Sequence, residues 1–270
     1  MPRSRFPLLV VLVMLLAVPS APASAAGLWL RWNDCHADGG VPARTFACDT
    51  NAGSEALVGS FVLGAGTSEV SGLEMYVVVH PAANAFPNWW AFRNPGTCRM
   101  NALTASFLPS SPTTGCPAWG TPDQLVGEFN VYPIAIAGGQ SGYSERITLV
   151  SAVPPTALAS LAAGQEYFAF RMNITHAKTV GTGACSGCQD ATCIALGKVK
   201  VTHQDPSLDV SVTNSAGPDG QFASWQGGVH GAVYPVPNET GTSNVYTMEC
   251  SSGATGNRHS TWGAIKSLYR

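Results

Sequence analysis

Cysteine is the residue type with the greatest chemical potential in this sequence. The 270-residue chain has eight cysteines, an even number, and all lie downstream of an apolar N-terminal segment. If that segment directs export, an even set of cysteines predicts a disulfide framework, because extracellular compartments are oxidising. We therefore expect four intramolecular disulfides among Cys35, Cys48, Cys98, Cys116, Cys185, Cys188, Cys193 and Cys250.

The spacing of the first four cysteines favours local pairs. Cys35 and Cys48 are separated by 12 residues, and Cys98 and Cys116 are separated by 17. Both intervening stretches are rich in turn-forming residues. The sequence predicts the disulfides Cys35–Cys48 and Cys98–Cys116, each stabilising the fold by about 3 kcal/mol for a loop of roughly 15 residues.

The other four cysteines leave more than one chemistry open. Cys185, Cys188 and Cys193 lie within nine residues, and Cys250 is far downstream. As disulfides they allow three pairings, each of which joins Cys250 to one of the other three. A Cys-x-x-Cys with two further thiols also has the ligand count of a zinc site. We favour disulfides because the compartment is oxidising, and the Gly-rich loop around the motif argues against a redox role.

Oxygen-bearing side chains gather around the first predicted disulfide loop. If Cys35 and Cys48 bond, the side chains of Asp34, Asp49 and Asn51 converge, and calcium prefers such hard oxygen ligands. The Asp49-x-Asn51 spacing matches only part of a calcium-binding loop. We expect a solvated acidic turn and no cofactor, with calcium at these residues as the alternative.

Two adjacent tryptophans, Trp89 and Trp90, follow Pro87. Adjacent residues on a strand point to opposite faces, so at most one of them is expected in the core. The other would offer its face to a pyranose ring as a carbohydrate platform, or would cover a sheet edge or pack under the Cys98–Cys116 loop. We favour packing, because large aromatic residues are normal core constituents.

Catalytic patterns are scarce. The sequence has no Gly-x-Ser-x-Gly elbow, no His-Glu-x-x-His motif and no phosphate-cradling loop. Glu74 and Glu128 lie on expected strands and could form the carboxylate pair of a glycoside hydrolase. Three histidines at the ends of expected strands could cluster in space, namely His80, His176 and His203.

Alternation of apolar and polar residues predicts the elements that position these groups. It is clearest in strands with one wet face at 73–79, 168–174 and 208–212. Further strands are expected at 28–32, 57–63, 103–108, 124–137 (broken at Pro133), 146–151, 194–202 and 222–226. Helical character is confined to 155–163 and 260–269.

Many short strands without βαβ alternation predict an all-β fold. We expect an antiparallel β-sandwich stapled by disulfides over residues 26–232. The tail, residues 233–270, is expected to fold back through Cys250 and to end in a short C-terminal helix.

Residues 1–25 have the features of an export signal. Arg3 and Arg5 precede an apolar run at 8–18, and Ala23-Ser24-Ala25 supplies a cleavage pattern. Because the two arginines leave with the signal, the net charge of −2 becomes −4. No block of like charge and no second apolar stretch of transmembrane length is present, which excludes a nucleic-acid surface and a membrane span after signal removal.

Five short stretches carry a family resemblance: Trp32–Cys35, Phe46–Asp49, Leu57–Phe61, Gly183–Cys188 and Trp262–Arg270. They resemble an uncharacterised group of secreted bacterial hypothetical proteins with no assigned activity. The resemblance implies export, a bacterial origin and a single co-occurring unit, and it carries over no functional residue.

These observations favour a secreted, non-enzymatic binding or surface-associated protein that recognises a carbohydrate or another protein. The expectation depends on the sandwich, the tryptophans and the missing catalytic motifs. One alternative is an exported, glycan-directed hydrolase whose residues converge only in the fold. The other is a structural protein of the cell envelope or matrix. A deep pocket with facing carboxylates would favour the hydrolase, and a shallow aromatic-lined groove would favour binding.

Overall fold

The computed structural model describes residues 26–83, 85–92, 96–109, 115–135, 143–217, 219–236 and 245–252. Within these residues the protein is all-β, and its helical segments are three short 3-10 turns: η1 (Pro122–Gln124), η2 (Pro155–Ala157) and η3 (Pro206–Leu208). Among the described helices, none has the length and apolarity needed to cross a membrane.

Two sheets contain most of the strands. The four-stranded sheet has the order β1 (Gly27–Trp32), β3 (Ser54–Val62), β9 (Glu166–Thr175), β5 (Leu103–Ser106). The eight-stranded sheet has the order β2 (Ala43–Arg44), β12 (Phe222–Trp225), β10 (Thr192–His203), β4 (Thr67–Pro81), β7 (Tyr143–Ala152), β6 (Val126–Ala135), with β11 (Val210–Val212) on β10 and β8 (Ala159–Leu161) on β4. The strand pairs are antiparallel except for β2 and β12, which are parallel.

The core forms between these two sheets because apolar residues alternate along their strands. Leu73 and Val77 of β4 and Phe170 of β9 are almost completely buried and belong to one hydrophobic cluster. Burying a side chain of this size stabilises the fold by about 1.5–3 kcal/mol. The strands expected at 73–79 and 168–174 are confirmed within β4 and β9.

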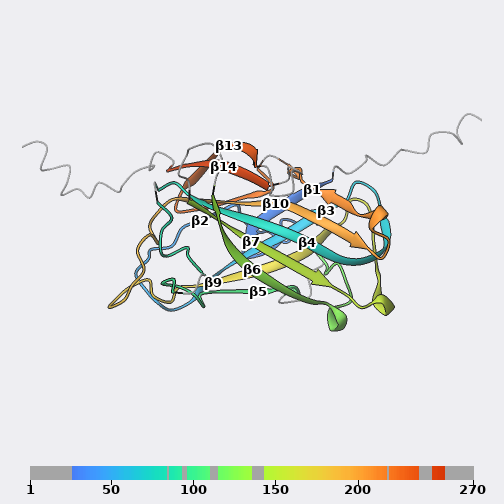
Figure 1. Ribbon diagram of the computed structural model, residues 1–270, viewed down its shortest axis with the longest axis horizontal. Helices are drawn as coiled ribbons and strands as arrows, with labels where there is room; N and C mark the ends of the chain where they lie inside the picture. The colour runs from blue at the N-terminus through green and yellow to red at the C-terminus, as the bar shows by residue number, and fades with distance from the viewer. Residues whose placement is uncertain are drawn as a thin grey trace, which may run out of the picture.

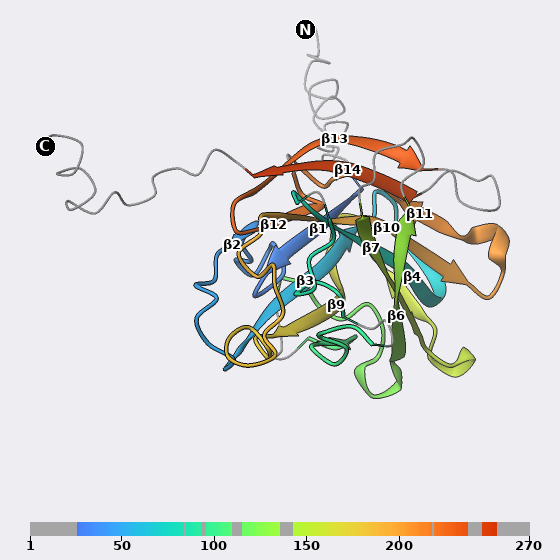
Figure 2. The same cartoon turned by 60° about the vertical axis from the view of Figure 1, so that its left-hand side comes forward.

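A third layer covers part of the eight-stranded sheet. The strands β13 (Gly228–Val236) and β14 (Val245–Ser252) form a hairpin that packs on β10, β4 and β12. Figures 1 and 2 show these orange and red strands along one side of the molecule. Because of this cover, Val78 on the outer face of β4 is buried, whereas Glu128 and Asn130 on the outer face of β6 are exposed.

All eight cysteines form disulfides, as predicted, but the predicted local pairs are wrong. Cys250 bonds to one of its three expected partners. The four bonds, spanning 81, 140, 87 and 57 residues, are Cys35–Cys116, Cys48–Cys188, Cys98–Cys185 and Cys193–Cys250. Since no cysteine is free, the four-thiolate zinc alternative is also wrong.

The sheet order explains the error in pairing. Strand β9 lies beside β3 and β5, so loops that are far apart in the sequence meet at the same sheet. Cys35 and Cys116 share a small apolar cluster with Val58 and Phe168. Spacing along the chain measures only local loop closure, and it contains no information about which loops the sheets bring together.

Several expected elements differ from the observed ones. The helix expected at 155–163 is instead η2 followed by β8, which pairs with β4. The break expected at Pro133 is absent because β6 is at the end of the sheet order, where a strand tolerates proline. In the strand expected at 208–212, Leu208 belongs to η3.

The expected domain boundaries lie partly within and partly beyond the described residues. Strand β13 runs across the boundary expected at residue 232, so the tail continues a strand of the hairpin. The expected export signal at 1–25 and the expected helix at 260–269 lie outside the described residues.

Candidate functional site

Trp89 and Trp90 are not a surface platform, because both side chains are completely buried. They lie in a turn rather than on a strand, so the two rings are not forced to opposite faces. Both contact Trp225, whose ring centre is 5.1 Å from that of Trp89 and 5.7 Å from that of Trp90. The Arg99 guanidinium stacks on Trp89, 3.7 Å from the ring centre. The favoured interpretation, packing rather than a sugar contact, thus agrees with the burial of both residues, whereas the expectation that at most one of them lies in the core is wrong.

The calcium alternative loses its premise, because Cys35 and Cys48 do not bond to each other. Asp34 and Asp49 are exposed in separate loops. The side-chain amide of Asn51 is engaged with a neighbouring loop: its oxygen accepts from Thr179 N at 2.7 Å and its nitrogen donates to Val180 O at 3.0 Å. Asn51 therefore tethers that loop.

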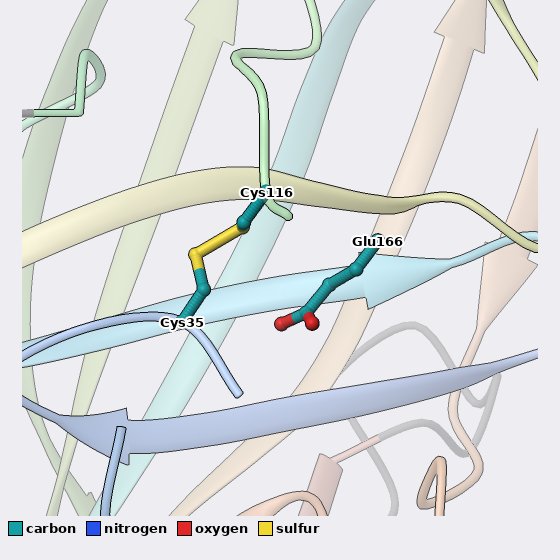
Figure 3. Close-up of side chains that lie close together, drawn as sticks. All are labelled: Cys35, Cys116 and Glu166. Atoms are coloured by element: carbon teal, nitrogen blue, oxygen red, sulfur yellow. A yellow bond between two sulfur atoms is a disulfide. The ribbon is translucent and has the colours of Figure 1, made fainter. Parts of the chain in front are cut away.

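Glu166 lies beside the Cys35–Cys116 disulfide, and the three side chains place ligand-type atoms within 4.8 Å of one another. Figure 3 shows the carboxylate beside the sulfur–sulfur bond. Its oxygens accept from the backbone N–H groups of His36, at 3.1 Å, and Ala37, at 2.8 Å, and from the Ser60 hydroxyl. With both sulfurs bonded to each other, this arrangement holds the turn that follows Cys35.

The histidines at the strand ends do not form one cluster. His80 lies opposite Cys193 on β10, and His203 lies ten residues further along that strand, about 33 Å away. His176 follows β9 in the other sheet and contacts Glu55, with Nε2 3.1 Å from Oε1.

Two of these histidines contact a hydroxyl, in arrangements that resemble parts of a hydrolase site. His80 Nδ1 is 2.6 Å from Ser144 Oγ, and burial lowers the pKa of His80. His203 Nε2 is 2.8 Å from Thr67 Oγ1, but its Nδ1 is 3.7 Å from Asp209, too far for a hydrogen bond. Ser144 and His203 are both buried, so these contacts fasten neighbouring strands.

Glu145 is a buried carboxyl on the inner side of β7, only 3% exposed. Burial raises the pKa of Glu145 from 4.5 to about 7, and a hydrogen bond from the backbone N–H of Phe92 opposes part of this shift. The fold therefore favours the protonated carboxyl.

The pKa of Glu145 predicts a loss of stability towards neutral pH. The contribution is fully present below about pH 4.5 and is lost as the pH rises through about 7, because ionisation then costs free energy only in the folded state. We expect the free energy of unfolding of the wild type to fall by at most about 3 kcal/mol over this pH range, and Glu145→Gln to abolish this fall. Urea unfolding of both proteins from pH 4.5 to 8 checks this; parallel stability curves would contradict it.

An open hollow of about 490 Å³ lies on the outer face of the eight-stranded sheet, at β6 and β7. It is lined by Glu128, Phe129, Asn130 and Tyr132 of β6 and by Thr148 and Val150 of β7. Alternate residues of a strand share a face, so the outward-facing residues of the two strands form cross-strand pairs in successive rows. These rows are Glu128–Val150, Asn130–Thr148 and Tyr132–Arg146. The hollow thus combines an aromatic ring with amide, hydroxyl and carboxylate groups, and Arg146 lies beside it, opposite Tyr132.

Tyr132 lies at one end of this hollow and is 42% exposed. Asn130 Nδ2 donates a hydrogen bond to Tyr132 Oη at 2.9 Å, and the Arg146 guanidinium lies 5.8 Å from the ring centre. These two contacts hold the ring in place while the residue stays partly exposed. A pre-positioned ring with polar neighbours is suited to a ligand with both apolar and hydroxyl-bearing faces.

The carboxylate pair considered for hydrolysis lies at the edge of the same hollow. Glu74 and Glu128 share a row, with Val150 of β7 between them. Two strand spacings place their Cα atoms about 10 Å apart on one face. Both are exposed on an open surface, whereas acid–base hydrolysis requires a cleft that encloses the sugar.

The residues of the hollow other than Glu128 were not singled out from the sequence. The available signal was the alternation of Glu128, Asn130 and Tyr132 on an expected strand, followed by a proline typical of edge strands. Arg146 and Thr148 gave no signal, because their position opposite β6 depends on strand pairing.

Comparison with known proteins provides little further information. No protein-family model matches the chain, and no curated protein matches it. Among solved structures, a cohesin module from a Clostridium perfringens ATCC13124 family 33 glycoside hydrolase has a TM-score of 0.32 and 10% sequence identity. The match covers 74% of this chain and 93% of the module. At this level the similarity identifies neither a ligand nor an activity.

Proposed function

We propose that this protein is an exported carbohydrate-binding protein that holds a glycan chain in the hollow at β6 and β7. The observation that carries the proposal is the accessible Tyr132 ring, fixed between Asn130 and Arg146 on an open sheet face. Sugar rings have apolar faces that pack on aromatic rings, and their hydroxyl groups pair with amide and carboxylate groups.

The rows of the hollow fit an extended ligand. From Tyr132 to Glu128 the strand rises about 13 Å, a length suited to a short oligosaccharide lying along β6. The open form of the hollow favours an internal segment of a chain over a small molecule enclosed on all sides.

Export and the finer fold class belong to this proposal. Residues 1–25 are proposed to be a removable signal, and four disulfides fit an oxidising compartment. The two larger sheets around one core are proposed to be a β-sandwich. We further propose that the chain belongs to the secreted bacterial group that its short stretches resemble.

Replacing Tyr132 tests the binding site. We expect Tyr132→Ala to weaken polysaccharide binding by about tenfold or more, corresponding to about 1.4 kcal/mol, because stacking area is lost. Affinity electrophoresis against a panel of neutral and acidic polysaccharides, followed by calorimetry, measures the change. Leu208→Ala is the control, since Leu208 is 50% exposed near β11. Equal losses in both variants would contradict the proposal.

The hydrolase alternative makes a different prediction. In that case Glu74 and Glu128, which lie in one cross-strand row, would hydrolyse a bound polysaccharide and release reducing ends. Glu128→Gln would abolish this release. The structural-protein alternative predicts no binding to any polysaccharide by wild type or by Tyr132→Ala.

A further inference from the structure

Arg146 differs from the other arginines of the described residues in its partners. Its guanidinium lies 5.8 Å from the centre of the Tyr132 ring, and no described protein oxygen accepts a hydrogen bond from it. Its buried Nε atom, like that of Arg99, has no hydrogen-bond partner. The others donate to carbonyl or carboxylate oxygens of the protein; they are Arg31, Arg44, Arg99 and Arg171. Arg146 is therefore a cation placed beside the Tyr132 ring, and its N–H donors make no hydrogen bond to a described group of the protein.

The surroundings of Arg146 define which anion it would accept. A guanidinium has five donors in a planar fork, which matches the two oxygens of a carboxylate. Lys200, on the same sheet face, is already paired with Asp209 at 2.7 Å. At the other end of the hollow, about 13 Å from Tyr132, the exposed carboxylate of Glu128 repels a second anion and accepts hydroxyl donors.

We propose that Tyr132 and Arg146 form a subsite for an acidic sugar, a uronic acid whose ring packs on Tyr132 and whose carboxylate pairs with Arg146. This inference rests on the proposed carbohydrate-binding function and specifies its ligand class. Glu128 selects a neutral sugar at the far end of the hollow. The ligand is then a glycan in which uronic acids are separated by neutral residues.

The test compares acidic polysaccharides with their carboxyl-reduced forms. The probes are hyaluronan, xanthan, alginate and polygalacturonate, each with its reduced counterpart, together with poly-glutamate as an acidic peptide. We expect wild type to bind an acidic form about tenfold or more tightly than its reduced form, and added salt to diminish this preference. Arg146→Gln should lose the preference but keep the weaker binding to the reduced form.

Two further variants separate specific pairing from general charge. Arg146→Lys should restore part of the preference, because lysine keeps the charge but lacks the fork. Lys178→Gln removes one exposed positive charge outside the hollow and should leave the preference unchanged. Thermal unfolding of every variant checks that the fold is retained.

Each outcome decides between the two proposals. Equal binding to acidic and reduced forms overturns the acidic subsite and leaves carbohydrate binding in place. An equal loss of preference in Lys178→Gln also overturns the subsite. Binding to poly-glutamate alone identifies an acidic protein partner and overturns both proposals, as does the absence of binding to every probe.

Discussion

Reduction of the four disulfides is expected to unfold this protein at 37 °C. The bonds close loops of 57 to 140 residues, and chain-entropy arguments assign about 4–5 kcal/mol to loops of these lengths. The loops overlap, so their contributions do not add. Even so, the loss of two such bonds is comparable with the whole stability of a typical domain, about 5–15 kcal/mol.

Thermal unfolding followed by circular dichroism, with and without a reductant, measures this effect. The double variant Cys48→Ser with Cys188→Ser tests the bond that closes the longest loop. Mapping of non-reduced peptides should recover Cys48 linked to Cys188 and Cys35 linked to Cys116. A peptide that joins Cys35 to Cys48, or an unchanged unfolding transition after full reduction, would refute the framework.

Trp225→Ala is expected to destabilise the fold by about 4 kcal/mol, among the largest effects of any single substitution. Trp225 is fully buried, and its ring centre lies 5.7 Å from that of Trp32 as well as close to Trp89 and Trp90. Its indole N–H also donates to Cys188 O at 2.8 Å. Truncation therefore opens a cavity at the centre of the aromatic cluster and removes a buried hydrogen bond.

Urea unfolding measures the loss caused by Trp225→Ala, and the half-buried Trp29 provides a matched control. Trp29→Ala should cost much less, because its ring stacks on exposed His36 at the surface. Trp225→Phe should fall between the two, since it keeps an aromatic ring but loses the indole donor. Equal destabilisation by Trp29→Ala and Trp225→Ala would contradict this description of the core.

The sequence predicted the strands well because alternation reports which side of a strand is buried. Leu73, Met75, Val77 and Val79 on the core face of β4 illustrate this. The wet outer face expected for the same stretch is wrong at Tyr76 and Val78, which are buried, because β13 and β14 pack over that side of the sheet. The number of disulfides was also predictable, from the even cysteine count. The partners of Cys35 and Cys98 were not, because they depend on the order of strands in the two sheets.

The candidate site depended on the same missing information. Trp89 and Trp90 were prominent in the sequence, yet the turn that contains them directs both rings inward. Tyr132 and Arg146 were inconspicuous because they are 14 positions apart, and only the pairing of β6 with β7 makes them neighbours. A surface site whose residues come from two paired strands cannot be located from the sequence, because it depends on the register of that pair.

The most direct test of carbohydrate binding is amide chemical-shift mapping of the 28.1 kDa protein during titration with the tightest-binding polysaccharide fragment. Carbohydrate binding at β6 and β7 predicts saturable shifts confined to residues 126–132 and 146–150. Shifts clustered instead at residues 97–102, which line a separate hollow of about 230 Å³, would contradict it. The absence of shifts at every fragment concentration would contradict it equally.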